Sequence, residues 1–151
     1  MAGDGWDEGA DWRDKQAIQE LIHLYSDAVN RQDWAQFEAV WAPDALWEVP
    51  HQIRKEGRVE ICEAAHEILD GADFIIQMAH CSVVTLLGGG RATATSTMQE
   101  IGRPQSGPGF IAYGIYYDEL IKGEDGWRFS YRRFQPIYMN SEPLSGQVIT
   151  P

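Results

Sequence analysis

The sequence predicts an α+β domain in which three helices come first and a curved, mostly antiparallel sheet follows. Apolar residues recur at helical spacing in the first half of the chain, whereas the second half alternates and is rich in β-branched and aromatic residues. Helices followed by a run of strands are typical of segregated α+β folds rather than of βαβ units. Glycines inside the long strands indicate a strongly bent sheet, whose concave face can form a pocket.

Length and charge restrict the possible classes of function. With 151 residues, the chain has the size of one domain and can bury a sizeable core. Its net charge of −11 argues against nucleic acid, which requires lysine and arginine opposite the phosphates, and against anionic membrane surfaces. The sequence shows no apolar run long enough for a membrane span and no signal peptide. Cys62 and Cys81 form no paired motif, as is typical of reduced cysteines, so we expect a cytoplasmic protein.

The first half of the chain contains the predicted helices. Residues 1–11 are an acidic, glycine-rich arm, and the domain proper spans residues 12–135, beginning with a helix that ends near Asn30. The apolar stripe of this helix consists of Ile18, Leu21, Ile22, Tyr25 and Val29. A short second helix opens at Gln32-Asp33 and stops before Pro43. We then expect a strand over residues 45–49, a loop from Pro50 to Glu56, and a third helix over residues 58–70.

The second half of the chain predicts long strands. Residues 74–87 and 91–101 are two strands separated by three glycines, and residues 109–134 are a hairpin whose turn is Gly-Glu-Asp-Gly. Regular alternation in the first of these strands places five side chains on one face: Ile76, Met78, His80, Ser82 and Val84. Residues 136–151 are expected to form a tail that closes over the pocket or contacts another subunit.

Three groups of residues occur in a recognisable order. The first runs from Ile18-Gln19-Glu20-Leu21 through Asn30-Arg31-Gln32-Asp33-Trp34 to Trp41-Ala42-Pro43-Asp44-Ala45. The second is Gly57-Arg58 with the later His80, and the third is Gly114-Ile115-Tyr116-Tyr117-Asp118-Glu119-Leu120 with Asp125-Gly126-Trp127-Arg128. Together they resemble the SnoaL-like domains of the NTF2-like superfamily, over about residues 12–135. The resemblance implies the NTF2-like (cystatin-like) cone, in which three N-terminal helices pack on a curved sheet and enclose a deep apolar pocket.

The resemblance also implies candidate catalytic residues. Family enzymes include scytalone dehydratase, hexachlorocyclohexane dehydrochlorinase and bile-acid 7α-dehydratase. Several of the lyases use a strand His as general base, oriented by an Asp near the end of the first helix and assisted by a helix Tyr and a final-strand Arg. The matching positions here are His80, Asn30, Tyr25, and Arg132 or its neighbour Arg133. Asn30 departs from the family pattern, because an amide can orient an imidazole but brings no charge.

The residues alone leave structural roles open for the same positions. A lone His on a strand is often only a hydrogen-bonded structural residue, and Tyr25 lies in the apolar stripe of its helix, where it can be a core aromatic. Arg132 and Arg133 point to opposite faces of their strand, and either can form a surface salt bridge.

The chain is rich in aromatic residues, which can line a pocket for a flat, apolar ligand. We expect substrate contacts from five side chains: Trp47, Met78, Tyr113, Tyr116 and Tyr117. Tyr113 and Tyr117 share one face of their strand while Tyr116 takes the other, so only one of these sets can face the pocket.

No cofactor or metal site is expected from the sequence. His51 and His66 lack the spacing to another ligand that zinc sites require. The glycines at residues 88–90 are typical of a turn, and the sequence has no dinucleotide-binding, P-loop or nucleophile-elbow motif. An enzyme with this sequence is therefore expected to use its own side chains alone.

The expected function is that of a cofactor-independent lyase acting on an apolar, aromatic or polycyclic, hydroxylated small molecule. His80 would move the proton, Tyr25 and Asn30 would orient it or the substrate, and Arg132 would stabilise negative charge. The leaving group would be water, or a one-carbon aldehyde released by C–C cleavage. Two alternatives stay open: an isomerase or cyclase of the same fold, and a non-catalytic ligand-binding domain or one like the β subunits of ring-hydroxylating dioxygenases. The resemblance also implies a homo-oligomer, either a dimer or a trimer.

Overall fold

The computed structural model describes residues 8–141 and 143–149, which contain three helices and six strands. In chain order these are α1 (Glu8–Arg31), α2 (Trp34–Ala39), β1 (Trp41–Val49), β2 (Ile53–Glu56), α3 (Arg58–Asp70), β3 (Ala72–Gly88), β4 (Arg91–Pro104), β5 (Phe110–Gly123) and β6 (Gly126–Asn140). The three predicted helices are present, although α1 begins inside the predicted arm, most of which lies outside the described residues. β2 lies in a segment for which the sequence predicted a loop.

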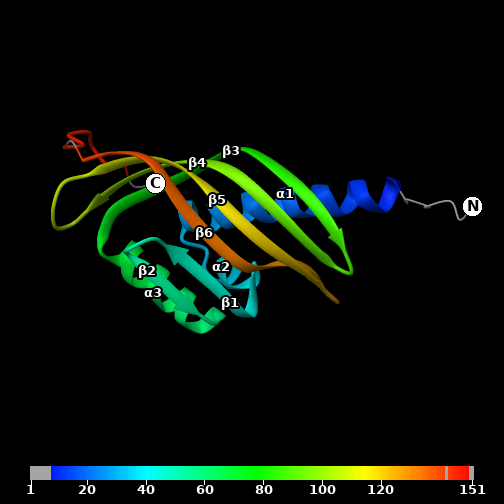
Figure 1. Ribbon diagram of the computed structural model, residues 1–151. Coiled ribbons are helices and arrows are strands. Elements are labelled where there is room, and N and C mark those ends of the chain that lie inside the picture. Colours follow the sequence, from blue (N-terminus) through cyan, green and yellow to red (C-terminus); the bar gives the residue numbers. More distant parts are fainter. Residues whose placement is uncertain (1–7, 142, 150–151) are drawn as a thin grey trace, which may run out of the picture.

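All six strands form one mixed sheet with the order β2-β1-β6-β5-β4-β3. β1 runs parallel to β6, and every other pair of neighbours is antiparallel. The four long strands curve together, and the sheet stays open because the edge strands β2 and β3 do not meet (Figure 1). The predicted α+β fold with a curved, mostly antiparallel sheet is therefore confirmed.

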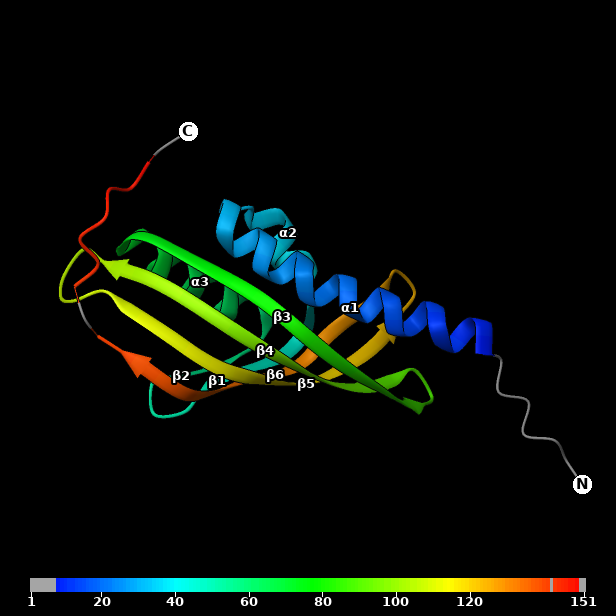
Figure 2. The ribbon, with the colours of Figure 1, turned by 90° about the horizontal axis from the view of Figure 1, so that it is seen from above.

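The helices lie on one side of the curved sheet and bury an aromatic core against it. Figure 2 shows α1 running along the sheet with α2 beside it, and Figure 1 shows α3 next to β1 and β2. Fully buried side chains of this core include Ile18, Ile22, Tyr25, Trp41, Tyr116 and Phe129. Within the described part of the chain, no helix is both long and apolar enough to cross a membrane.

Two glycines let aromatic rings lie flat on the concave face of the sheet. At Gly102 an added Cβ would come within 2.6 Å of the Phe110 ring, and at Gly114 it would meet both the Phe134 ring and, at 2.6 Å, the carbonyl oxygen of Gln135. Since real Cβ atoms do not approach other atoms so closely, both positions need glycine as long as the rings stay in place.

We expect Gly114→Ala to destabilise the fold, because the new methyl group would push Phe134 and the β6 backbone away. Overpacking of this kind costs about 1–3 kcal/mol of the free energy of unfolding, which urea denaturation would measure. Gly146→Ala is the matched control, since an added Cβ there meets nothing within 4 Å. Equal stability of the two variants would contradict the packing argument.

A β-bulge at His80 changes which side chains of β3 face the helices. Ala79 and Cys81 pair with consecutive residues of β4, so His80 between them is one residue too many for the ladder. Before the bulge Gln77 is buried, and after it Val84 is buried, which reverses the odd–even pattern. The prediction that one face holds a single regular set is therefore wrong for this strand. The extra residue divides the expected set of Ile76, Met78, His80, Ser82 and Val84.

A second bulge, at Ser130, decides which arginine of β6 faces the core. Consecutive residues of β5 pair with Phe129 and Tyr131, so Ser130 is the extra residue. Simple alternation from the buried Phe129 would have turned Arg133 inward. The bulge turns Arg132 inward instead, and Arg132 is 0% exposed.

The C-terminal segment is held against the end of β4 and the loop that follows it. β6 continues to Asn140, so residues 136–140 belong to the sheet rather than to the predicted tail. Arg103 donates hydrogen bonds to the carbonyl oxygens of Leu144 (3.0 Å) and Gly146 (2.9 Å). The Leu144 side chain also packs on Gly109, where an added Cβ would lie 2.7 Å from its Cγ.

Candidate active site

A cavity of about 440 Å³ lies between the concave face of the sheet and the helices, which is the size of a small-molecule site. Its wall is largely apolar and includes Val29, Phe37, Trp47, Phe110, Phe134 and Met139. Its polar side chains are Tyr25, Gln52, Gln77, Glu100 and Tyr116. Of the residues that the structure describes, no lysine, arginine or histidine lines this cavity. The site therefore suits a compact apolar ligand without negative charge.

β4 places Glu100 in the cavity wall, because it shares the inward-facing parity of Ser96 and Met98. Burial raises the pKa of the Glu100 carboxyl group from 4.5 to about 7, although a hydrogen bond from Gln77 favours its charged form. Gln77 Nε2 donates this bond to Glu100 Oε2 at 3.2 Å. A carboxyl group that titrates near neutral pH can both accept and return a proton.

Tyr25 from α1 and Tyr116 from β5 bring their hydroxyl oxygens to 3.4 Å from each other in the cavity wall. Burial raises the pKa of both hydroxyl groups, the charge of Arg132 opposes this rise, and the charge of Glu100 adds to it. The pair carries two O–H hydrogens, and the hydrogen bond between the two hydroxyl groups uses only one of them. The other can be donated to an oxygen atom of a ligand.

Arg132 lies behind this tyrosine pair, outside the cavity wall. Its guanidinium carbon is 4.1 Å from the ring centroid of Tyr25, 3.9 Å from that of Tyr116 and 4.3 Å from that of Phe129. Asp118 Oδ1 lies 3.6 Å from Arg132 Nε, and both side chains are fully buried. Burial raises the pKa of Asp118 to about 6, an effect that the Arg132 charge opposes. Of the two arginines expected as alternatives, Arg132 and Arg133, it is Arg132 that faces inward. Aromatic rings nevertheless separate it from the cavity.

The expected acid/base residue lies on the other face of the sheet. His80 is exposed, and its Nε2 is 3.2 Å from Oε1 of Gln99, whose amide in turn donates to the Tyr113 hydroxyl group. The expected convergence of His80 with Tyr25 on one cavity is therefore not found. Alternation from the buried Gln77 turns His80 outward, and the bulge changes the inward direction only beyond it, where Val84 is buried.

The expected substrate contacts divide in the same way. Trp47 and Tyr116 line the cavity, whereas Tyr113 and Tyr117 are 41% and 44% exposed on the opposite face. Met78 is half-buried and lies outside the cavity wall. Of the two tyrosine sets of β5, the structure places that of Tyr116 in the cavity wall.

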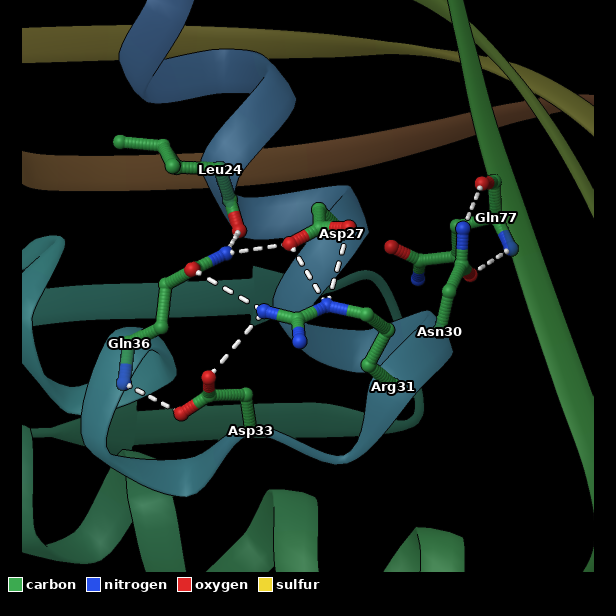
Figure 3. A network of polar contacts seen from close by, with 7 residues as sticks. All are labelled: Leu24, Asp27, Asn30, Arg31, Asp33, Gln36 and Gln77. Atoms are coloured by element: carbon green, nitrogen blue, oxygen red, sulfur yellow. Dashed lines mark hydrogen bonds and ion pairs between the residues drawn. The ribbon is translucent and has the colours of Figure 1, made fainter.

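Asn30, at the end of α1, binds the backbone of β3 instead of an imidazole (Figure 3). Its Nδ2 donates to the carbonyl oxygen of Gln77 at 2.8 Å, and its Oδ1 accepts from the Gln77 N–H at 2.7 Å. β3 is an edge strand, so the amide supplies the donor and acceptor that a neighbouring strand would otherwise supply. Asn30 thereby fixes Gln77, whose side chain reaches Glu100.

Asn30→Asp would restore the residue type that the resemblance leads one to expect, but we expect it to weaken the fold. Aspartate loses the donor to Gln77 and brings a carboxylate next to a carbonyl oxygen. The expected loss is about 1 kcal/mol of the free energy of unfolding, measured in urea. Asn30→Ala should cost at least as much, because it loses both the donor and the acceptor. An aspartate variant as stable as the wild type would contradict this account of the contact.

Sequence reasoning missed Glu100 and Gln77, the two polar side chains that face each other in the wall. A signal for Glu100 was present, because it continues the even-numbered series of Ala92, Ala94, Ser96 and Met98 on its strand. An acidic residue at the end of an apolar alternating face is a candidate buried carboxyl group. Gln77 had no such signal, because the residues on both sides of it along the strand are apolar and do not show which face is buried.

Comparison with known proteins places this fold and cavity in a family. The sequence matches the model of the SnoaL-like domain over residues 10–133. The chain belongs to the SnoaL-like domain family. The motifs that suggested the resemblance lie within this matched range, so the predicted family is confirmed. No curated protein matches the sequence.

Solved structures share the architecture of this SnoaL-like domain at low sequence identity. A candidate scytalone dehydratase from Novosphingobium aromaticivorans is 16% identical, with a TM-score of 0.81 over 93% of this chain and 99% of that one. A type 3 hexachlorocyclohexane dehydrochlorinase from Novosphingobium barchaimii is also 16% identical, with a TM-score of 0.83 over 96% and 99%. A protein of unknown function with a cystatin-like fold from Nostoc punctiforme has 17% identity and a TM-score of 0.66 over 82% and 90%. These matches establish the cystatin-like fold.

Proposed function

We propose that this SnoaL-like domain is a cofactor-independent lyase, which removes a proton from an uncharged, apolar ring compound and expels a small leaving group such as water. The observation that carries the proposal is Glu100, a carboxyl group with a pKa of about 7 in the wall of an apolar cavity. Glu100 takes the acid/base role that the sequence analysis gave to His80.

The chemistry can be assigned to four side chains. The ionised carboxylate of Glu100 accepts a proton from a carbon atom of the substrate, and the electron pair left behind forms a double bond as the bond to the leaving oxygen breaks. The Tyr25–Tyr116 pair donates a hydrogen bond to the oxygen on which negative charge develops. Gln77 holds the carboxylate by its 3.2 Å hydrogen bond. The proton then returns from Glu100 to the leaving hydroxide, which departs as water.

Two further observations support elimination from an uncharged substrate. A carboxylate ligand would meet Glu100 without a cation in the cavity wall of the described chain, which would be unfavourable. The names of two proteins that share the fold, a candidate scytalone dehydratase and a hexachlorocyclohexane dehydrochlorinase, denote eliminations of water and of hydrogen chloride.

The tyrosine pair also favours a second candidate function, an isomerase. If the substrate carries a carbonyl group, the same base can form an enolate that the tyrosines stabilise, and the proton can return to another carbon of the same molecule. Isomerisation conserves the mass of the substrate, whereas elimination lowers it by the mass of the leaving group.

A screen of uncharged ring alcohols, ring ketones and halogenated rings, read by mass spectrometry, tests the proposal. Products lighter by one molecule of water or of hydrogen halide would support the lyase, and products of unchanged mass would support the isomerase. On any compound that reacts, His80→Ala should keep the wild-type rate, because the imidazole lies on the opposite face. Full dependence of turnover on His80 with none on Glu100 would overturn the assignment.

The rate should increase with pH around neutrality. Glu100 must be ionised to accept a proton, and its pKa is about 7, so the fraction of active enzyme grows as pH increases through that value. We therefore expect kcat/KM to rise about tenfold per pH unit below pH 7 and to level off above it. Titration of kcat/KM with a slow substrate measures this directly. If kcat/KM instead changed with pH only in the range of an ordinary carboxyl group and stayed constant around pH 7, the role of Glu100 would be contradicted.

A further inference from the structure

The guanidinium group of Arg132 makes unusual contacts for a buried charge. Its neighbours are three aromatic faces at 3.9–4.3 Å and one carboxylate oxygen at 3.6 Å. No hydrogen bond within the described structure reaches its three nitrogens or the two carboxylate oxygens of Asp118. A cation within about 6 Å of a ring centroid is attracted by the ring face, so the rings take the place of hydrogen-bond partners.

Two of these three rings belong to tyrosines that line the cavity. Tyr25 and Tyr116 both contact the cation with a ring face and line the cavity, where their oxygens meet at 3.4 Å. The positive charge therefore lies directly behind the donor pair, one ring away from any ligand. Asp118 is also behind the rings, on the side of the arginine.

We propose that Arg132 is a positioning residue that makes the Tyr25–Tyr116 pair a binding site for a developing oxyanion, with Asp118 as the counter-charge that limits its field. This inference rests on the proposed function, whose oxyanion it assigns to the tyrosine pair. Arg132 does not touch the substrate. It acts through the two rings, whose O–H groups become stronger donors in its field.

The charged groups around the pair determine the direction of the effect. Arg132 opposes the ionisation cost of both hydroxyl groups, whereas Glu100 and, for Tyr25, Asp118 add to it. Removing the charge of Asp118 should therefore strengthen oxyanion binding. Removing the charges of both Arg132 and Asp118 should weaken it. Opposite outcomes from neighbouring substitutions distinguish an electrostatic role from a purely structural one.

The test uses 4-nitrophenol, which absorbs visible light as the phenolate, so its ionisation in the site can be followed without turnover. All proteins carry Glu100→Gln, which removes the cavity carboxyl group that would itself titrate near neutral pH. Compared with this parent, Asp118→Asn should lower the pH at which bound nitrophenol ionises by about 1 unit. The double variant Arg132→Met/Asp118→Asn should raise it by about the same amount. Arg133→Met, which changes an arginine on the other face of β6, should leave it unchanged.

Near-UV circular dichroism of each variant establishes that the aromatic core is intact before titration. The proposal is overturned if the folded Asp118 and double variants ionise bound nitrophenol at the same pH, or if the folded parent does not bind nitrophenol. The proposed function fails separately, when Glu100→Gln retains turnover, and that result leaves the titration unaffected.

Discussion

Glu100→Gln should lower turnover by a large factor and at the same time stabilise the fold above neutral pH. Loss of the proton acceptor removes the contribution of a positioned general base, which is about 10²–10⁴-fold in rate. Glutamine keeps the size of the side chain and can still bind the amide of Gln77, so the cavity should keep its shape. The loss is measured as kcat/KM on whichever compound the wild type converts.

The stabilisation follows from the same raised pKa. The carboxyl pKa is 4.5 in the unfolded chain and about 7 in the folded protein, so between these values the folded protein binds more protons. The contribution of Glu100 to stability therefore falls as pH rises from about 4.5 to about 7, since ionisation of this group is costlier in the cavity than in water. The difference amounts to about 3 kcal/mol above pH 7, and the glutamine variant does not suffer this loss.

Urea denaturation of Glu100→Gln and of the wild type at about pH 5 and about pH 8 would measure the effect. The variant should be more stable than the wild type only at the higher pH. Glu119→Gln is the matched control, because Glu119 is an exposed residue of β5 and its removal should change neither quantity. If Glu100→Gln had the same stability as the wild type at both pH values, the carboxyl group would not be costly to ionise and its proposed role would lose its physical basis.

The general fold could be predicted because hydrophobic periodicity and turn chemistry are local properties. The stripe through Ile18, Ile22 and Tyr25 specified α1, and the two-residue turn between Gly123 and Gly126 specified the β5–β6 hairpin. β2 was missed because a strand of four residues at an edge, exposed on alternate positions, has little apolar pattern. Its pairing with β1 is a tertiary interaction that a local pattern does not contain.

The candidate site was predicted only in part, because it depends on strand parity across bulges. A single extra residue at His80 turned Val84 inward on β3, and another at Ser130 turned Arg132 inward on β6. Neither bulge has a proline or a glycine at its extra position, so the sequence contains no local signal that predicts it. Glu100 lies on a stretch of β4 with unbroken pairing to both neighbours, and regular alternation would have predicted its direction correctly.

Arg132→Met should destabilise the protein severely on its own and far less when combined with Asp118→Asn. Methionine can fill the space among the three rings, but it leaves the carboxylate of Asp118 buried without its counter-charge, which costs about 3–5 kcal/mol. Part of this cost can be avoided if Asp118 takes up a proton, so the single variant should recover stability as pH falls below the range in which that carboxyl group ionises. Urea denaturation of both variants at about pH 8 and about pH 5 measures these differences.

The double variant removes both buried charges, and replacement of buried ion pairs by neutral side chains of similar volume is often neutral or stabilising. We therefore expect the midpoint of unfolding of Arg132→Met/Asp118→Asn to lie at a urea concentration at least as high as that of the wild type. The control variant Arg133→Met should change the free energy of unfolding by less than about 1 kcal/mol. Equal destabilisation of the single and double variants would show that packing, not charge, is what Arg132 contributes. If the double variant is stable but binds an oxyanion poorly, the ion pair is retained at the expense of stability. Its value then lies in the field that it creates behind the two tyrosines.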